Sequence, residues 1–321
     1  MARADRAFAV LIGLAFASSA ILIALLLTLA PRVEQLAARG AEDTSDLVAA
    51  LVLVLATCGI SLGLATLFRQ LVATAALIRS LVARKVRLPA RVRLAAAGLE
   101  LDGRIDVVAD ERPFSFCYWF LRPRICLSTT LVERLDRDEL RAVLLHERYH
   151  LRHRDPLRLV VARYFAAGLY VVPVVDELVA FYTLQKEIAA DEDAVRAHGG
   201  VRPLASALYK LLPDADDVSL GLLVPVSSLS VAEARIEQLV TERPLALALS
   251  PVSVALSAGA LVAAGVLVAV QGGASLAFEA LPPLVAVPGL LIGPASLLFA
   301  AAIDGGLHQL RPQLQRSPQR A

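Results

Sequence analysis

Residues 138–150 read Asp-Glu-Leu-Arg-Ala-Val-Leu-Leu-His-Glu-Arg-Tyr-His, a pattern that predicts an amphipathic helix with two acids in its first turn. His146 and His150 are four residues apart, so both imidazoles project from one face of this helix. Two histidines at this spacing suit zinc, and Glu147 lies beside them, where a carboxylate can take a proton from the attacking water. The stretch therefore predicts a catalytic metal site. A solvated helix with incidental histidines is the alternative interpretation.

A catalytic zinc needs a third protein ligand and one open position for water. In one class of zinc peptidases the third ligand is a histidine six residues after the second, and that position is Pro156 here, which excludes the class. His153 lies on much the same face as His150, but adjacent turns of one helix do not easily supply three tetrahedral ligands. We therefore interpret His153 as an interfacial or solvated residue.

The better candidate for the third ligand is Glu187, in a second predicted helix. Asp191 follows it by four residues, so the glutamate can bind the metal while the aspartate accepts the free N–H of a ligand histidine. Glu177 and Glu192 are alternatives to Glu187. A solvated helix face is the competing interpretation of Glu187.

The composition indicates a membrane protein. Of the 321 residues, 57% are hydrophobic and 19% are charged, and the mean hydropathy is +0.64, which is too apolar for an ordinary soluble protein. The formal net charge is only +2, so no broad basic face for nucleic acid is expected. The three cysteines show no Cys-x-x-Cys spacing, which indicates neither a disulfide framework nor a thiolate zinc site.

Two apolar runs near the N-terminus predict a transmembrane hairpin over residues 1–68. Residues 7–30 carry no charge, and about 20 apolar residues suffice to cross the hydrocarbon layer. We favour an uncleaved anchor over a signal peptide, whose apolar part is shorter. Residues 47–68 repeat the pattern and are followed by a basic stretch, residues 69–93, which the positive-inside rule places in the cytoplasm. Residues 31–46 then form the external loop.

A second pair of apolar runs, residues 245–271 and 281–303, predicts a C-terminal transmembrane hairpin over residues 245–303. The tail at residues 304–321 is basic again. Both termini and the polar middle of the chain, residues 69–244, are therefore expected on the cytoplasmic side of the cell membrane.

Residues 157–184 are long enough to span a bilayer, but they contain arginines, acids and a proline. If they crossed once, Glu187 would emerge on the side opposite His146 and could not share its metal. We therefore predict a helical hairpin, shallow or re-entrant, that turns near Val172 and Pro173.

Three short runs rich in β-formers lie at residues 105–108, 114–120 and 124–128. They predict a small sheet packed on the helix at residues 138–150. The predicted fold class is therefore α+β: a multi-span helical membrane protein with a cytoplasmic domain that carries the metal site.

The two site segments resemble a known family. His146-Glu-Arg-Tyr-His150 followed by Glu187-Ile-Ala-Ala-Asp191, between paired membrane helices, is similar to the integral-membrane gluzincin peptidases. The strongest resemblance is to the BlaR/MecR antirepressor peptidase family, and HtpX and the CAAX prenyl endopeptidases are more distant. The resemblance covers roughly residues 84–239 and includes the surroundings of the motif at residues 122–128, 140–146 and 151–156.

The resemblance implies roles for particular residues. His146, His150 and Glu187 would be zinc ligands, Glu147 the general base, and Asp191 a carboxylate that supports a ligand histidine. A late family element is matched by Arg235-Ile-Glu-Gln-Leu239, where Arg235 would pair with a site carboxylate or with the oxyanion of the tetrahedral intermediate. A surface salt bridge is the alternative for Arg235.

Two further features follow from the resemblance. In related gluzincins an edge strand binds the substrate backbone, and Phe114-Ser-Phe-Cys117 is the candidate here, with an ordinary core strand as the alternative. Inside the motif, Arg148 and Tyr149 replace residues that are small or apolar in the family, and we expect both to point away from the metal.

Together these observations predict a zinc-dependent endopeptidase in the cell membrane, with its active site facing the cytoplasm and a protein or peptide as substrate. The BlaR/MecR resemblance implies regulated cleavage of a cytoplasmic repressor, whereas the HtpX resemblance implies quality control of membrane proteins. A non-catalytic membrane scaffold that retains a metal site is a third alternative. The β-lactam sensors of the family carry a penicillin-binding domain after the last span, and we expect no such receptor role here.

Overall fold

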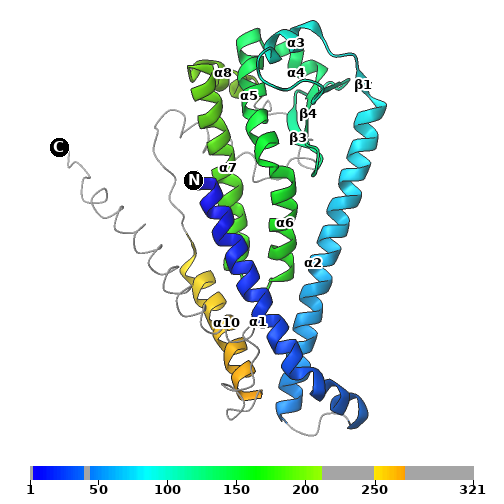
Figure 1. The fold of residues 1–321 in the computed structure, drawn as a ribbon, viewed down its shortest axis with the longest axis vertical. Coiled ribbons are helices and arrows are strands. Elements are labelled where there is room, and N and C mark those ends of the chain that lie inside the picture. The colour runs from blue at the N-terminus through cyan, green and yellow to red at the C-terminus, as the bar shows by residue number, and fades with distance from the viewer. Residues whose placement is uncertain (1–2, 40–43, 212–248, 272–321) are drawn as a thin grey trace, which may run out of the picture. The chain divides into compact units, whose positions relative to one another are not determined.

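The structure, a computed structural model, describes residues 3–39, 44–211 and 249–271. The helices are α1 (Arg3–Arg39), α2 (Thr44–Ala83), α3 (Ala90–Ala96), α4 (Thr129–Arg134), α5 (Arg137–His153), α6 (Asp155–Gly168), α7 (Val174–His198), α8 (Arg202–Leu211) and α10 (Pro251–Gln271) (Figure 1). The strands are β1 (Lys85–Val86), β2 (Ile105–Val108), β3 (Ser115–Tyr118) and β4 (Arg124–Ser128). The described chain is thus mostly helical with one small sheet.

The chain forms two compact units, which we describe separately. The first comprises residues 1–8, 65–164 and 180–245, and the second comprises residues 9–64, 165–179 and 246–321. The sheet and the helix at residues 138–150 belong to the first unit. The apolar parts of α1 and α2, the turn between α6 and α7, and α10 belong to the second.

The sheet has the strand order β1-β2-β4-β3. β2 and β4 are parallel, with Val107 opposite Leu127, and β3 pairs antiparallel with β4, with Phe116 opposite Cys126. Each of the three predicted β runs therefore contains a strand. β3 is an edge strand and ends at Tyr118, because the next residue, Trp119, has a φ of 69° that breaks the extended backbone.

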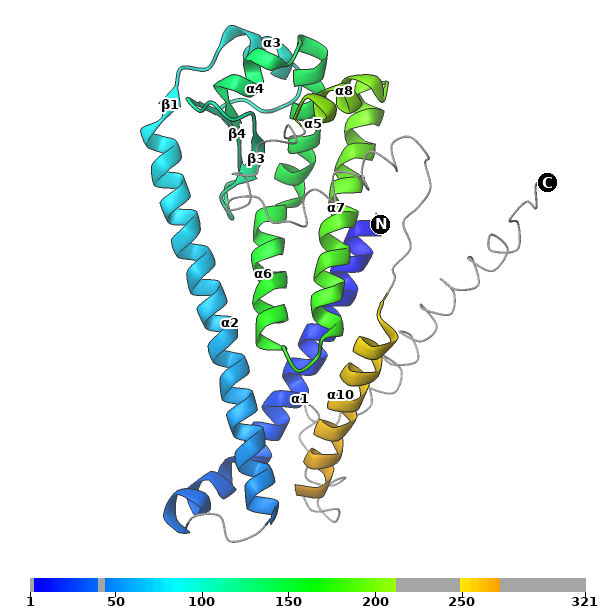
Figure 2. The same ribbon diagram turned by 180° about the vertical axis from the view of Figure 1, so that it is seen from behind.

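Helix α5 is the central helix of the first unit and packs on the sheet, on α3 and on α8 (Figure 2). It begins with a capping box, in which the Asp136 side chain accepts from the Glu139 N–H and the Glu139 side chain accepts from the Asp136 N–H. Leu140 and Leu144 are fully buried in the core. The left-handed Arg154, with a φ of 52°, ends α5 and turns the chain into α6.

A buried carboxylate holds the strands of the sheet together. Asp106 on β2 accepts hydrogen bonds from Arg124 on β4 and from the Tyr118 hydroxyl on β3, and it pairs with Lys85 on β1. Burial alone would raise the pKa of Asp106, but these donors outweigh it and hold the pKa far below its usual value. The ionised carboxylate is therefore part of the folded sheet.

Two helices are long and apolar enough to cross a bilayer, over Ala4–Leu27 and Ala50–Ala83. Helix α1 continues past its apolar part to Arg39, so part of the predicted loop at residues 31–46 is helical. The physical reason is that residues 32–39 are mostly good helix formers, so loss of apolar character does not end the helix. Polarity marks the end of a membrane segment and not the end of a helix.

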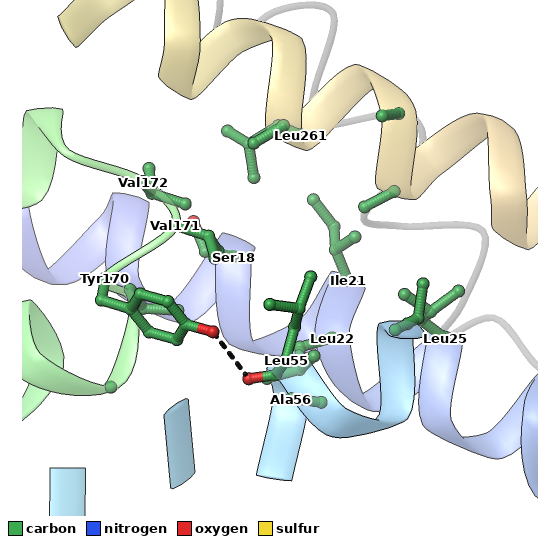
Figure 3. A pocket seen from close by; sticks show the side chains of 16 residues that line it. Ser18, Ile21, Leu22, Leu25, Leu55, Ala56, Tyr170, Val171, Val172 and Leu261 are labelled. Atoms are coloured by element: carbon green, nitrogen blue, oxygen red, sulfur yellow. Dashed lines mark hydrogen bonds between the residues drawn. The ribbon is translucent and has the colours of Figure 1, made fainter. Parts of the chain in front are cut away.

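In the second unit, the turn at residues 169–173 joins α6 to α7 (Figures 1 and 2), and hydrogen bonds connect this region to α2 and α10. The Tyr170 hydroxyl donates to the Leu55 carbonyl at 3.3 Å (Figure 3), and the Val174 N–H donates to the Ser257 hydroxyl at 3.0 Å. Gly59 lies so close to α6 that an added Cβ would meet the Gly168 carbonyl oxygen at 2.5 Å. Close backbone contact of this kind requires glycine.

Parts of the predicted C-terminal region lie outside the described residues: residues 245–248, the apolar run at 281–303 and the basic tail at 304–321. Helix α10 covers Pro251–Gln271 of the predicted hairpin.

Candidate metal centre

Three side chains from two helices of the first unit converge. Helix α5 supplies His146 and His150, and α7 supplies Glu187. The two Nε2 atoms are 3.1 Å apart, and the Glu187 carboxylate oxygens lie 3.6 Å from Nε2 of His146 and 3.7 Å from Nε2 of His150. The structure thus brings the three predicted ligands together, although 36 residues separate His150 from Glu187 in the sequence.

This spacing fits a zinc ion. Zinc binds histidine nitrogen and carboxylate oxygen at about 2.1 Å in a tetrahedron, whose ligand atoms are then about 3.4 Å apart. The observed separations of 3.1, 3.6 and 3.7 Å lie close to that value. Two histidines and one glutamate are also a common ligand set of catalytic zinc, with a fourth position left for water.

Both histidines are oriented by buried aspartates. Nδ1 of His146 lies 2.8 Å from Oδ1 of Asp191, and Nδ1 of His150 lies 2.6 Å from Oδ2 of Asp155. With a metal bound, each ring would be neutral and would carry its proton on Nδ1, facing the aspartate, so that Nε2 would be free to bind the metal. The predicted position of Asp191 beside a ligand histidine agrees with this geometry.

The sequence interpretation missed Asp155. It follows His150 by five residues, which places it beyond the end of α5, and the left-handed Arg154 brings its carboxylate back to the ring of His150. Tyr182 on α7 donates a further hydrogen bond to Asp155 at 3.5 Å. The sequence signals were an acid at the start of a new helix, a position that helix capping also explains, and the family resemblance over residues 151–156, which assigned no role to Asp155.

The electrostatics of the centre favour positive charge. Burial alone would lower the pKa of His150, but the Glu187 carboxylate and the hydrogen bond to Asp155 raise it to about 9. Burial would raise the pKa of Glu187, yet its histidine neighbours hold it well below the usual value. Lys186, which is also buried, lies 3.6 Å from a Glu187 oxygen and is a nearby cation that the sequence interpretation missed.

Glu147 follows His146 directly on α5, is buried, and accepts hydrogen bonds from the edge strand β3. The Ser115 hydroxyl donates to Oε1 of Glu147 at 2.8 Å, and the Cys117 thiol donates to the Glu147 backbone carbonyl at 3.2 Å. Burial raises the pKa of the Cys117 thiol, so it stays protonated and can donate. These contacts connect the predicted base to the predicted substrate strand, and no sequence signal pointed to them.

The structure places the alternative ligands elsewhere. Nδ1 of His153 donates to the Tyr149 carbonyl at 2.9 Å, and its ring stacks on that of Tyr149 at 4.0 Å. Glu177, in the second unit, accepts from the Ser250 N–H at 2.9 Å and the Ser253 hydroxyl at 2.6 Å, at the start of α10.

The remaining predicted residues lie as follows. Glu192 is exposed on α7. Arg148 lies 4.0 Å from Asp193, also on α7. Arg235 lies outside the described residues.

Comparison with known proteins gives related sequences. A family model described as BlaR1 peptidase M56 matches residues 15–239. A protease HtpX homologue of Methanothermobacter thermautotrophicus is 30% identical in an alignment that covers 30% of this chain and 47% of that protein. Protease HtpX homologues of Helicobacter acinonychis and Helicobacter pylori are 61% identical over 31 residues, which is 10% of this chain and 10% of each relative. The chain thus spans less than half the length of these curated relatives.

Proposed function

Because the chain belongs to the BlaR1 peptidase M56 family, we propose that it is a zinc-dependent endopeptidase of the cell membrane. The observation that carries the proposal is the convergence of His146, His150 and Glu187 at separations of 3.1 to 3.7 Å, with Glu147 beside them. When bound there, zinc supplies a Lewis acid that activates water and polarises the scissile carbonyl. The scaffold interpretation is less favourable, because a structural metal site has no need of Glu147.

Glu147 is the proposed general base. It takes a proton from the attacking water and later passes it to the leaving amine, as general acid–base catalysis of peptide hydrolysis requires. The hydrogen bond from Ser115 fixes one carboxylate oxygen, which orients the other for proton transfer. By the family resemblance, Arg235 would pair with a site carboxylate or with the oxyanion, and Lys186 is a described cation 3.6 Å from a Glu187 oxygen.

The edge strand β3 is the proposed substrate platform. Its residues Ser115–Tyr118 pair with β4 on one side, and the sheet order leaves the other side without a strand in the described part of the chain. An extended substrate can add to such an edge through backbone hydrogen bonds. Because Ser115 and Cys117 also contact Glu147, a substrate on this edge is next to the base.

We further propose a multi-pass arrangement with the active site in the cytoplasm. Helix α2 has 40 residues and is therefore about 60 Å long, twice the thickness of about 30 Å of the hydrocarbon layer. Its C-terminal part would emerge into the cytoplasm with the basic residues 69–93. In this arrangement the chain crosses the membrane in two hairpins, at residues 1–68 and 245–303. The peptidase domain at residues 69–244 lies between them and contains the shallow or re-entrant hairpin at residues 157–184.

The proposed substrate is a cytoplasmic protein. Regulated cleavage of a transcriptional repressor is the first candidate, because the BlaR1 family model matches residues 15–239. Quality control of membrane proteins is the second, favoured by the alignments with HtpX homologues.

The test is to compare Glu147→Gln with the wild type in purified full-length protein. The variant should keep one zinc per chain and lose cleavage of a proteome-derived peptide library by about 10²- to 10⁴-fold. Glu133→Gln, at an exposed glutamate on α4, is the matched control and should retain both properties. Peptide cleavage at the wild-type rate by Glu147→Gln would remove the mechanism. Zinc without cleavage in the wild type would favour the scaffold.

A further inference from the structure

The start of α1 lies against the helices of the metal centre (Figures 1 and 2). Residues 1–8 belong to the first unit, together with all of α5 and the start of α6. Arg158 on α6 donates to the Asp5 carboxylate on α1 at 2.8 Å, although 153 residues separate the two. Phe8 lies on the same face of α1 as Asp5, and its ring centre is 5.1 Å from the Arg158 guanidinium carbon. The Phe8 ring centre is also 5.1 Å from that of Tyr182 on α7. The start of α1 therefore contacts one residue of α6 and one of α7.

Tyr182 connects this contact to a ligand histidine. Its side chain is fully buried, and its hydroxyl donates to Oδ1 of Asp155 at 3.5 Å. The other oxygen of the same carboxylate, Oδ2, lies 2.6 Å from Nδ1 of His150. Because a carboxylate is planar and rigid, a partner on Oδ1 restricts the direction in which Oδ2 can accept. Tyr182 therefore restricts the orientation of the His150 ring.

Arg158 influences the direction in which the Tyr182 hydroxyl donates. The Arg158 guanidinium interacts with this hydroxyl as well as with Asp5. An arginine side chain has only N–H donors, so the Tyr182 oxygen faces donors and positive charge. The hydroxyl hydrogen is thereby directed away from Arg158 and towards the Asp155 carboxylate, which can only accept when it is ionised.

A purely structural ion pair does not explain this arrangement. The side chains of Asp5 and Arg158 are 23% and 29% exposed, and partly exposed ion pairs contribute little to stability. The helix dipole favours an acid in the first turn of α1, but that accounts for Asp5 alone. Arg158 is one of two charged residues in the apolar stretch 156–175, where a charge is unfavourable without a specific partner. Its position therefore indicates a role at the site that its contacts reach.

We infer that Tyr182 and Arg158 are positioning residues of the metal centre, and that Asp5 and Phe8 at the start of α1 hold them in place. Through Asp155 they fix the orientation of His150, so the start of α1 is part of the site although it supplies no ligand. The inference rests on the proposed function, because it requires that His150 binds zinc.

The experiment measures zinc affinity in the purified full-length protein at pH 7, by competition with a chromophoric chelator. Tyr182→Phe removes only the hydroxyl and should weaken zinc binding about two- to tenfold, the effect of one lost hydrogen bond. Tyr209→Phe, at an exposed tyrosine of the first unit, is the matched control and should bind zinc as the wild type does. Arg158→Gln should have an effect of the same size, and Arg163→Gln, at an exposed arginine of the same helix, should have none.

Two readouts separate positioning from a general loss of stability. Asp5→Asn should weaken zinc binding about two- to fivefold by itself but cause no further loss in Arg158→Gln, because the two residues act through one contact. Cobalt(II) bound in place of zinc gives a visible absorption spectrum that reports the geometry of the ligands. Tyr182→Phe should change this spectrum, whereas Tyr209→Phe should not, with circular dichroism to show that each variant is folded.

The outcomes distinguish this inference from the proposed function. If the wild type binds zinc, then equal zinc affinities and equal cobalt spectra in the wild type, Tyr182→Phe and Arg158→Gln would overturn the inference alone. Additive losses in Asp5→Asn and Arg158→Gln would overturn the part assigned to α1. A wild type that binds no zinc would overturn the inference together with the proposed function.

Discussion

Removal of the Asp155 carboxylate should weaken zinc binding without removing any ligand. Asp155 is 2% exposed and lies 2.6 Å from Nδ1 of His150. In Asp155→Ala the ring loses the acceptor that fixes its tautomer and its orientation. Loss of such a supporting carboxylate typically weakens metal affinity by about 10- to 100-fold, which corresponds to about 1.4–2.7 kcal/mol. The short distance and the burial of both groups place the expected effect at the upper part of this range.

The assay is a competition for zinc between the purified protein and a chromophoric chelator at pH 7. Asp193→Ala is the matched control, because Asp193 is also an acid of the first unit, but its side chain is 34% exposed and its ion pairs with the described residues Arg148 and Arg196 are long, at 4.0 and 3.9 Å. Circular dichroism and thermal unfolding check that each variant is folded. Equal zinc affinities in Asp155→Ala, Asp193→Ala and the wild type would refute the assigned role of Asp155.

Three further outcomes are expected. The pKa of His150 is raised to about 9, so below that pH zinc must displace a proton from the ring. The zinc affinity should therefore rise about tenfold per pH unit up to about pH 9, and zinc binding should release about one proton. A zinc affinity that does not change with pH would contradict this. Ser115→Ala removes the hydrogen bond of 2.8 Å to the Glu147 carboxylate and should lower kcat about tenfold while the protein still binds zinc. Ser80→Ala, at an exposed serine, should change neither kcat nor zinc binding. Asp106→Asn should lower the free energy of unfolding by about 1–3 kcal/mol at pH 7, which is less than for a fully buried ion pair because the Arg124 side chain is 31% exposed. Asp102→Asn, at an exposed aspartate, is the control and should leave the free energy of unfolding unchanged. Because the pKa of Asp106 is lowered by folding, its stabilisation is present above about pH 4 and is lost as the pH falls further, so the difference in chemical denaturation between wild type and Asp106→Asn should shrink in acid.

The local elements of the fold were predictable from the sequence. The helix that carries His146 and His150 and the three β runs depend on periodicity and on short-range propensity, which act within a few residues. The apolar helices followed from uncharged length alone. The sequence predicted an apolar span that ends at residue 30 and a loop from residue 31, whereas helix α1 continues to Arg39, because helix propensity continues after apolar character ends.

The family could also be predicted from the sequence, because it is marked by two short motifs, at residues 146–150 and 187–191, each of which lies within one helix. The spacing of His146 and His150 fixes their common face through the geometry of a single helix. The choice between Glu177 and Glu187 was a different kind of problem, since both are acids on α7. Ten residues along a helix are about 15 Å, so the two carboxylates cannot serve one site.

The roles of these acids depend on how the elements pack. The tertiary structure places the Glu187 carboxylate within 3.7 Å of both histidines and bonds Glu177 to residues at the start of α10. It also brings Asp155 to His150 and Ser115 to Glu147. None of these contacts follows from propensity, because each depends on how separate elements pack or on one left-handed residue at the end of α5. Local sequence patterns were enough to predict the helix that carries His146 and His150, the three β runs and the residue types that can bind zinc. The packing of α5 with α7 and β3 determined which carboxylates reach the histidines, because hydrogen bonds and metal ligation act only over a few ångströms.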